Sequence, residues 1–228
     1  MILKHPRHAF HAQRQTGFTL IEISVVLVII GIIIGAVSIG RDVQRTAAYQ
    51  RIATEFVQGW AISYDTFASN NGIVIADSAS NPTGYVNAAT GTPLCMNNLR
   101  TAMQAAGIRM PTGRAEGSET QTAYLDSNGL PQEMVICFSN VSWSEPGATT
   151  GTYVTRNRNV MTLTGLSPAM AKMLDNHFDG RVDARFGKFR EQSVAANTGT
   201  ASIAWSQSES ALDESQSVTM SAYLLMNQ

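Results

Sequence analysis

The sequence predicts an α+β protein in which one long N-terminal helix, about half of it strongly apolar, precedes an antiparallel sheet. The helix is predicted because residues 18–69 contain no proline and combine an apolar run with apolar side chains at helical spacing. The sheet is predicted because the chain beyond Gly72 is rich in Gly, Asn, Ser and Thr and has short β-like runs between polar turns. With 228 residues, the chain is long enough for a head domain with a buried core.

The first half of the predicted helix is a candidate membrane span. Ile23 to Gly40 are 18 consecutive uncharged residues, about enough to cross a hydrocarbon core of roughly 30 Å. Residues 1–17 contain three basic and no acidic side chains, which predicts a cytoplasmic leader and a translocated head. The alternatives are a cleavable secretory signal, with Ala36-Val37-Ser38 at its cleavage site, and a plain signal anchor. The long apolar run and Glu22 disfavour the secretory signal, and a plain anchor does not account for Glu22.

The second half of the helix is predicted to be amphipathic and to end at Asn70-Asn71-Gly72. Its apolar stripe consists of Val43, Ala47, Ala48, Ile52, Phe56, Trp60, Tyr64 and Phe67. We expect core packing for the members of the stripe from Ile52 onward. The chain then divides into a basic leader (1–17), a transmembrane half-helix (18–40) and a head (41–228) that includes the amphipathic half-helix (41–69).

Several short elements are predicted beyond this helix. One helix is expected over about Asn98–Ala106 with Asn97 as its cap, and another from Ser167-Pro168 to about His177. The β-like runs are Ile73–Ala76, Glu133–Val141, Tyr153–Arg156, Val160–Thr164, Ala201–Trp205 and Val218–Leu225. No internal repeat and no second membrane span are evident, so one domain on one stalk is expected.

Glu22 is the most informative residue of the apolar segment. An ionisable side chain inside a membrane span costs roughly 2 to 3 kcal/mol on insertion scales, and such residues usually have a partner and a function. If the chain were cut between Gly17 and Phe18, the new α-amino group would lie one helical turn from Glu22 on the same face. The sequence itself therefore supplies a candidate partner.

The segment around this bond resembles the processing site of type IV prepilins and type II secretion pseudopilins. The matching residues are Gly17-Phe18-Thr19-Leu20-Ile21-Glu22, which follow a short basic leader and open an apolar helix. The resemblance implies that a prepilin peptidase of the inner membrane cuts after Gly17 and methylates Phe18. It also implies that Glu22 pairs with the N-terminal amine of a neighbouring subunit during filament assembly, and that the distal half of the helix packs on an antiparallel sheet.

Cys95 and Cys137 are the two cysteines of the chain. The predicted topology places both in an oxidising periplasm, where paired cysteines are usually joined, so one disulfide is expected. The alternative is two separate buried thiols that pack as small apolar side chains.

Three aspartates in the segment 167–190 suggest a weaker hypothesis. The segment faintly resembles a C-terminal pilin region, and some pseudopilins bind calcium through loop carboxylates, which makes Asp175, Asp179 and Asp183 calcium candidates. Their spacing does not match an EF-hand loop. We favour the alternative of a turn in which Asp caps a backbone amide while Arg181 and Arg185 balance the charge. No other cofactor is expected.

Composition argues against two classes of function. Only 14% of residues are charged and the formal net charge is −1, so no basic nucleic-acid-binding face is expected. Once the leader is removed, His177 is the sole histidine, and no phosphate-binding loop, dinucleotide fingerprint, Cys-x-x-Cys or His-Glu-x-x-His motif is present. We therefore expect a protein that is not an enzyme.

The resemblance implies a structural subunit of a type IV pilus or of a type II secretion pseudopilus. Its partners would be the prepilin peptidase, other pilin or pseudopilin subunits and the inner membrane. Before assembly it would be a single-pass inner-membrane protein with a periplasmic head, and after assembly part of a cell-surface or periplasmic filament. The alternative is a minor pilin at the filament tip whose head binds a surface, DNA or a secreted substrate.

Overall fold

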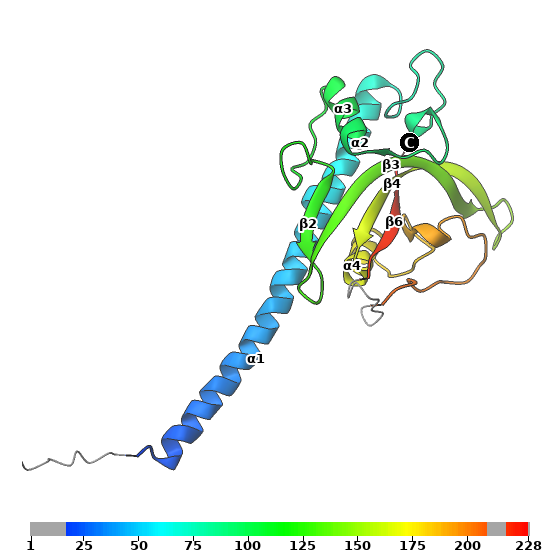
Figure 1. Ribbon diagram of the computed structural model, residues 1–228. Helices are drawn as coiled ribbons and strands as arrows, with labels where there is room; N and C mark the ends of the chain where they lie inside the picture. The colour runs from blue at the N-terminus through cyan, green and yellow to red at the C-terminus, as the bar shows by residue number, and fades with distance from the viewer. Residues whose placement is uncertain (1–16, 209–217, 228) are drawn as a thin grey trace, which may run out of the picture. The chain divides into compact units, whose positions relative to one another are not determined.

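A computed structural model describes residues 17–208 and 218–227 of the chain (Figure 1). It has the predicted α+β arrangement, with a long N-terminal helix followed by an antiparallel sheet of six strands. Contacts within the chain group it into two compact units, one that ends at Gln44 and one over Arg45–Gln228. We call the second unit the head.

The long helix consists of α1 (Leu20–Arg51), a π-helical turn η1 (Ile52–Val57) and α2 (Gln58–Asn71). It ends at Gly72, whose φ of 69° is left-handed and whose N–H donates to the Ala68 carbonyl at 2.9 Å. Glycine adopts this conformation without steric penalty, so the expected stop signal is where the helix ends.

The six strands form one antiparallel sheet in the order β1-β3-β4-β6-β5, and β2 also pairs with β3. They are β1 (Leu94–Cys95), β2 (Gln121–Leu125), β3 (Pro131–Pro146), β4 (Tyr153–Leu166), β5 (Phe189–Glu191) and β6 (Met220–Leu225). β3 and β4 form a long curved hairpin, in register from Val135↔Thr164 to Pro146↔Tyr153 (Figure 1).

Four of the six predicted strand runs contribute to strands, since Glu133–Val141 lies in β3 and Val218–Leu225 contains β6. The expected runs Tyr153–Arg156 and Val160–Thr164 are parts of the one strand β4. The runs Ile73–Ala76 and Ala201–Trp205 are not strands. These two runs nevertheless contribute apolar side chains to the core, because Ile75 and Trp205 are buried there as parts of loops. Burial, and not strand pairing, explains the apolar residues at these positions.

The core lies between the distal part of the long helix and one face of the sheet. Phe138 of β3 stacks on Tyr64 with ring centroids 5.0 Å apart and contacts Trp60 at 6.2 Å. Met134 and Ile136 precede Phe138 at alternate positions of β3 and are fully buried. Alternation places these three side chains on the same face of the strand, and this face packs against the helix.

Two further helices complete the head. They are α3 (Met96–Ala105) and α4 (Pro168–Asp179). The predicted cap of α4 is confirmed, because the Ser167 side chain accepts the Met170 N–H at 3.4 Å. The predicted cap of α3 was wrong: the residue before this helix is Cys95, in extended conformation, and Asn97 lies inside the first turn. Short 3-10 turns lie at η2 (Val86–Ala88) and η3 (Gln192–Val194).

Candidate processing site and functional regions of the head

Gly17 and Phe18 lie just before α1, and the fold gives no reason for either residue type. A Cβ built on Gly17 would meet no atom within 4 Å, so a larger residue would fit there as far as the chain itself is concerned. The side chain of Phe18 is 84% exposed. A requirement for glycine and phenylalanine at these positions therefore has to come from outside the folded chain.

Glu22 forms a reciprocal cap at the start of α1. Its Oε2 accepts the Thr19 N–H at 2.7 Å and the Thr19 hydroxyl at 2.9 Å, and its own N–H donates to the Thr19 hydroxyl at 3.3 Å. This is a capping box, which satisfies backbone donors at the helix start. The carboxylate is thus bonded to Thr19, the residue after Phe18, whose nitrogen a cut after Gly17 would convert to a free amine. The Thr-x-x-Glu spacing was the signal for this cap, and our reading of the sequence did not use it.

Between Leu20 and Val37, the large apolar side chains of α1 are all exposed in the described part of the chain. Leu20 is 91% exposed, and the exposure is still 50% at Val37. The helix is long and apolar enough to cross a membrane by length and composition. Such a surface is not stable in water, so this segment needs a lipid or protein environment.

One family model matches the chain, over residues 12–38, and its description is the prokaryotic N-terminal methylation motif. The chain carries a type IV prepilin-like leader signature. Gly17, Phe18 and Glu22 all lie inside the matched range. No curated protein and no solved structure matches the chain. The motif indicates a precursor of the type IV pilin or pseudopilin kind, a class that is usually structural and not enzymatic.

The head of this prepilin-like chain contains the disulfide expected from the sequence. Cys95 and Cys137 are bonded, with Cα atoms 4.4 Å apart, and they are register partners of β1 and β3. The bond ties the long connection between α2 and β2 to the central strand of the sheet, directly before α3. This connection has little other strand pairing, which is the physical reason for a covalent link at this place.

Asp175 is completely buried within the head. Its Oδ2 accepts the Asp183 N–H at 2.7 Å and the Trp205 indole N–H at 2.8 Å, while its Oδ1 has no partner. Burial raises the pKa of Asp175 to about 6, and the negative charges of Asp179 and Asp183 add to this effect. The carboxyl group therefore titrates near neutral pH.

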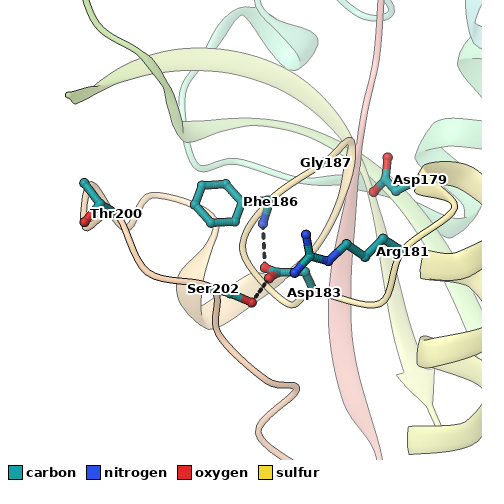
Figure 2. A pocket seen from close by; sticks show the side chains of 7 residues that line it. All are labelled: Asp179, Arg181, Asp183, Phe186, Gly187, Thr200 and Ser202. Atoms are coloured by element: carbon teal, nitrogen blue, oxygen red, sulfur yellow. Dashed lines mark hydrogen bonds between the residues drawn. The ribbon is translucent and has the colours of Figure 1, made fainter. Parts of the chain in front are cut away.

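Asp179 and Asp183 act as acceptors for the backbone of the following loop. Asp179 accepts the N–H groups of Lys188 and Phe189, each at 2.8 Å. Asp183 accepts the N–H of Phe186 at 3.0 Å and the hydroxyl of Ser202 (Figure 2). Burial on its own would raise the pKa of Asp183, but these hydrogen bonds outweigh it and lower the pKa.

The aspartates thus cap backbone amides, as the favoured alternative to calcium expected. Arg185 differs from that expectation: it is buried and donates to the carbonyls of Asn197 and Ala201, at 3.1 and 2.8 Å, instead of balancing an aspartate. Within residues 17–208 and 218–227, no group of three His, Cys, Asp or Glu side chains is placed to hold a metal ion. Calcium binding by Asp175, Asp179 and Asp183 stays a prediction.

A cavity of about 400 Å³ is lined by two of these aspartates, Asp179 and Asp183. Figure 2 shows the side chains that line it, all of which come from the segment after α4 or from its last residue. They are Asp179, Arg181, Asp183, Phe186, Gly187, Thr200 and Ser202. His177, the one histidine beyond residue 17, is exposed near the end of α4 with its ring against Phe178.

Proposed function

We propose that this chain is a structural subunit of a type IV pilus or of a type II secretion pseudopilus. The observation that supports this most directly is the leader signature over residues 12–38, which overlaps a helix whose described large apolar side chains from Leu20 to Val37 are all exposed. A prepilin peptidase would cut after Gly17 and methylate Phe18. The subunit would stay in the inner membrane with its head in the periplasm until it joins a filament at the cell surface or in the periplasm.

Assembly would proceed through the apolar half of α1. Packing between helices of neighbouring subunits buries the exposed apolar side chains, and the carboxylate of Glu22 pairs with the Phe18 amine of a neighbouring subunit. The low-dielectric surroundings make such a pairing important, because an unpaired charge in that setting is costly. The disulfide of the head supports an oxidising compartment.

The test is the intact mass and N-terminal sequence of the protein recovered from membranes of cells that express the peptidase. We expect a chain that begins at Phe18 and carries the extra mass of one methyl group. A chain that retains residues 1–17 in the presence of active peptidase, or that begins elsewhere, would overturn the proposal.

The second candidate is a minor subunit at the filament tip whose head binds a ligand. The polar cavity beside Asp179 and Asp183 favours it, because a filament core needs no such cavity. The abundance of this chain in sheared filaments separates the two: a main structural subunit is the dominant protein, and a tip subunit is scarce. Neighbouring genes separate the two kinds of filament, since a secretin with secretion components favours a pseudopilus and a retraction ATPase favours a pilus.

A further inference from the structure

We propose that Asn128 is a site of spontaneous modification, at which the side-chain amide is lost and the residue becomes isoaspartate or aspartate. Asn128 and Gly129 lie in the turn that joins β2 to β3 (Figure 1). The reaction needs only water as a co-reactant, so the inference goes beyond the proposed function and does not rest on it.

The chemistry of the modification involves these two neighbouring residues. The main-chain nitrogen of Gly129 attacks the side-chain carbonyl carbon of Asn128 and closes a five-membered succinimide ring. The side-chain nitrogen leaves as ammonia, together with the proton of the Gly129 N–H. Water then opens the ring at one of its two carbonyls, to give aspartate or, with the main chain continued through the side chain, isoaspartate. A glycine favours this attack because it has no Cβ to hinder the approach.

The sequence contains three bonds at which such a ring can close against a glycine. They are Asn71-Gly72, Asn128-Gly129 and, with loss of water instead of ammonia, Asp179-Gly180. The first and the third lie at the C-termini of α2 and α4, where the glycine N–H groups donate to the carbonyls of Ala68 and Asn176 at 2.9 and 3.0 Å. At both positions the attacking nitrogen is thus held in the last turn of a helix.

The side chains at these two helix ends are held as well. The Asn71 amide nitrogen donates to the Phe67 carbonyl at 2.9 Å. The Asp179 carboxylate accepts the N–H groups of Lys188 and Phe189. Ring closure at either position therefore requires the helix end to open and the side chain to leave its partners.

Asn128 lacks this protection. It is exposed in a turn, and within residues 17–208 and 218–227 its side-chain amide has no hydrogen-bond partner, although its backbone N–H donates to the Asp126 carboxylate at 2.9 Å. The Gly129 N–H donates to the Asp126 carbonyl at 3.1 Å, and a Cβ built on Gly129 would meet no atom within 4 Å. Exposed turns open at lower free energy than packed helices, so the fold directs the reaction to Asn128.

The modification changes the charge of this turn. Asp126 is the charged residue of the segment 125–130, and it is only 5% exposed because its carboxylate accepts N–H groups of the turn itself. A carboxylate at position 128 adds a negative charge to a surface that is otherwise neutral. It does so beside Ser127, whose carbonyl accepts a hydrogen bond from Arg45 of the long helix at 2.9 Å. Modified molecules therefore form a separate, more acidic population.

The experiment incubates the purified full chain in mild detergent at mildly alkaline pH, where the attacking nitrogen loses its proton more readily. Mass spectrometry follows the peptides that contain residues 71 and 128, and the exchange of an amide NH2 for OH identifies the product by its mass. Labelling by an isoaspartyl methyltransferase distinguishes isoaspartate from aspartate. The same incubation of the reduced, urea-unfolded chain gives both rates without the fold. Asn128→Gln is the matched variant, because its longer side chain would have to close a six-membered ring and reacts far more slowly.

In the folded chain we expect Asn128 to react roughly tenfold faster than Asn71, which corresponds to a difference of about 1.4 kcal/mol in the free energy of local opening. In the unfolded chain the two rates should be comparable. Isoaspartate should appear in the peptide around residue 128 of the wild type and be absent from it in Asn128→Gln.

Three kinds of result would overturn the inference. The first is a rate at Asn71 in the folded chain that equals or exceeds the rate at Asn128, or no product at Asn128 under conditions that modify the unfolded chain. The second is aspartate without isoaspartate, which would exclude ring closure onto Gly129. The third is a preference for Asn128 that is as large in the unfolded chain as in the folded one, since the local sequence and not the fold would then select the site.

Discussion

Two stretches of the same long helix both carry large apolar side chains, and these side chains have opposite surroundings. Along Leu20–Val37 the large side chains are 45% to 91% exposed, whereas Trp60 and Tyr64 further along are completely buried by the head. The chain therefore provides a packing partner for the second stretch and none for the first. The difference teaches that a continuous apolar run along a helix requires another molecule to cover it, whereas an apolar stripe with polar residues beside it can be covered by the head.

The comparison separates the consequences of mutation in the two stretches. A change near Gly17 or Glu22 should affect processing and assembly while the head stays folded. A change in the head should affect the free energy of unfolding while the leader is still cut. A single substitution that changes both leader processing and the free energy of unfolding would contradict this separation.

The largest effect is expected for Gly17→Val. A peptidase acting at the membrane surface needs a small residue at the cut, so the precursor should accumulate almost uncleaved although the fold itself accommodates a side chain there. Intact mass of membrane protein measures the fraction processed, and Phe18 should be methylated only in the cleaved form. Processing of this variant at the wild-type level would contradict the assignment of Gly17.

Glu22→Ala should be inserted and cleaved but should be nearly absent from sheared filaments. Removal of the carboxylate leaves the amine of a neighbouring subunit unpaired in a low-dielectric environment. Glu22→Gln is the control, because it keeps the shape and one acceptor for Thr19 but not the charge. Wild-type amounts of either variant in filaments would leave Glu22 with its helix-capping role alone.

In the head, replacing Cys95 and Cys137 together by serine should lower the free energy of unfolding by roughly 4 kcal/mol in the chain-entropy model for a loop of about 43 residues. Denaturant unfolding of the purified chain measures this, and reduction of the wild type should give a similar loss. Leader cleavage should be unchanged. An equal stability of the variant and the oxidised wild type would show that the connection is already held by other contacts.

Gly165→Ala should cost roughly 3 kcal/mol, because it combines a left-handed backbone with a direct clash. The φ of Gly165 is 75°, and a Cβ there would lie 2.0 Å from the Glu133 carbonyl oxygen. Gly151→Ala is the matched control: its φ is 79°, but no atom lies within 4 Å of the added carbon. The control should cost only about 1 kcal/mol, from the backbone conformation alone. Equal losses in thermal unfolding would contradict the close approach of β3 and β4 at Gly165.

The smallest effect concerns the pH dependence of stability. Burial raises the pKa of Asp175 to about 6, above its value in the unfolded chain. The folded state thus binds this proton more tightly, and its contribution to stability is present at low pH and lost as the pH rises through about 6. Asp175→Asn cannot ionise, so its stability relative to wild type should rise by roughly 2 kcal/mol between about pH 4 and pH 8. A constant difference across that range would contradict the raised pKa.

The sequence predicted those parts of the fold that depend on local pattern. The helix to Asn71, the cap at Ser167 and the central strands follow from periodicity and from caps and turns that neighbouring residues define. The disulfide between Cys95 and Cys137 followed from composition and from the predicted topology, since the chain has no other cysteine.

The parts that the sequence did not reveal depend on contacts between distant segments. The strand β5 has three residues and exists because it pairs with β6. Asp175 accepts a hydrogen bond from Trp205, thirty residues away, and the spacing of residues in the sequence does not predict that contact. The attachment of the β2–β3 hairpin to the long helix likewise depends on distant contacts, because Tyr49 donates to the Leu125 carbonyl and Arg45 to the Ser127 carbonyl.

The short outer strands of the sheet have a consequence for polymer growth. β1 has two residues, β5 has three and β2 has five, and none of them gives another chain a long template for backbone pairing. In the described part of the chain, β4 extends past its last β6 partner over Tyr153–Arg158, and there Arg156 and Arg158 carry charge and pair with Glu145. Charged side chains on a free edge discourage strand addition. In the proposed filament, subunits would be concentrated through their helices without their sheets joining edge to edge, and the ordered polymer would not become a β-aggregate.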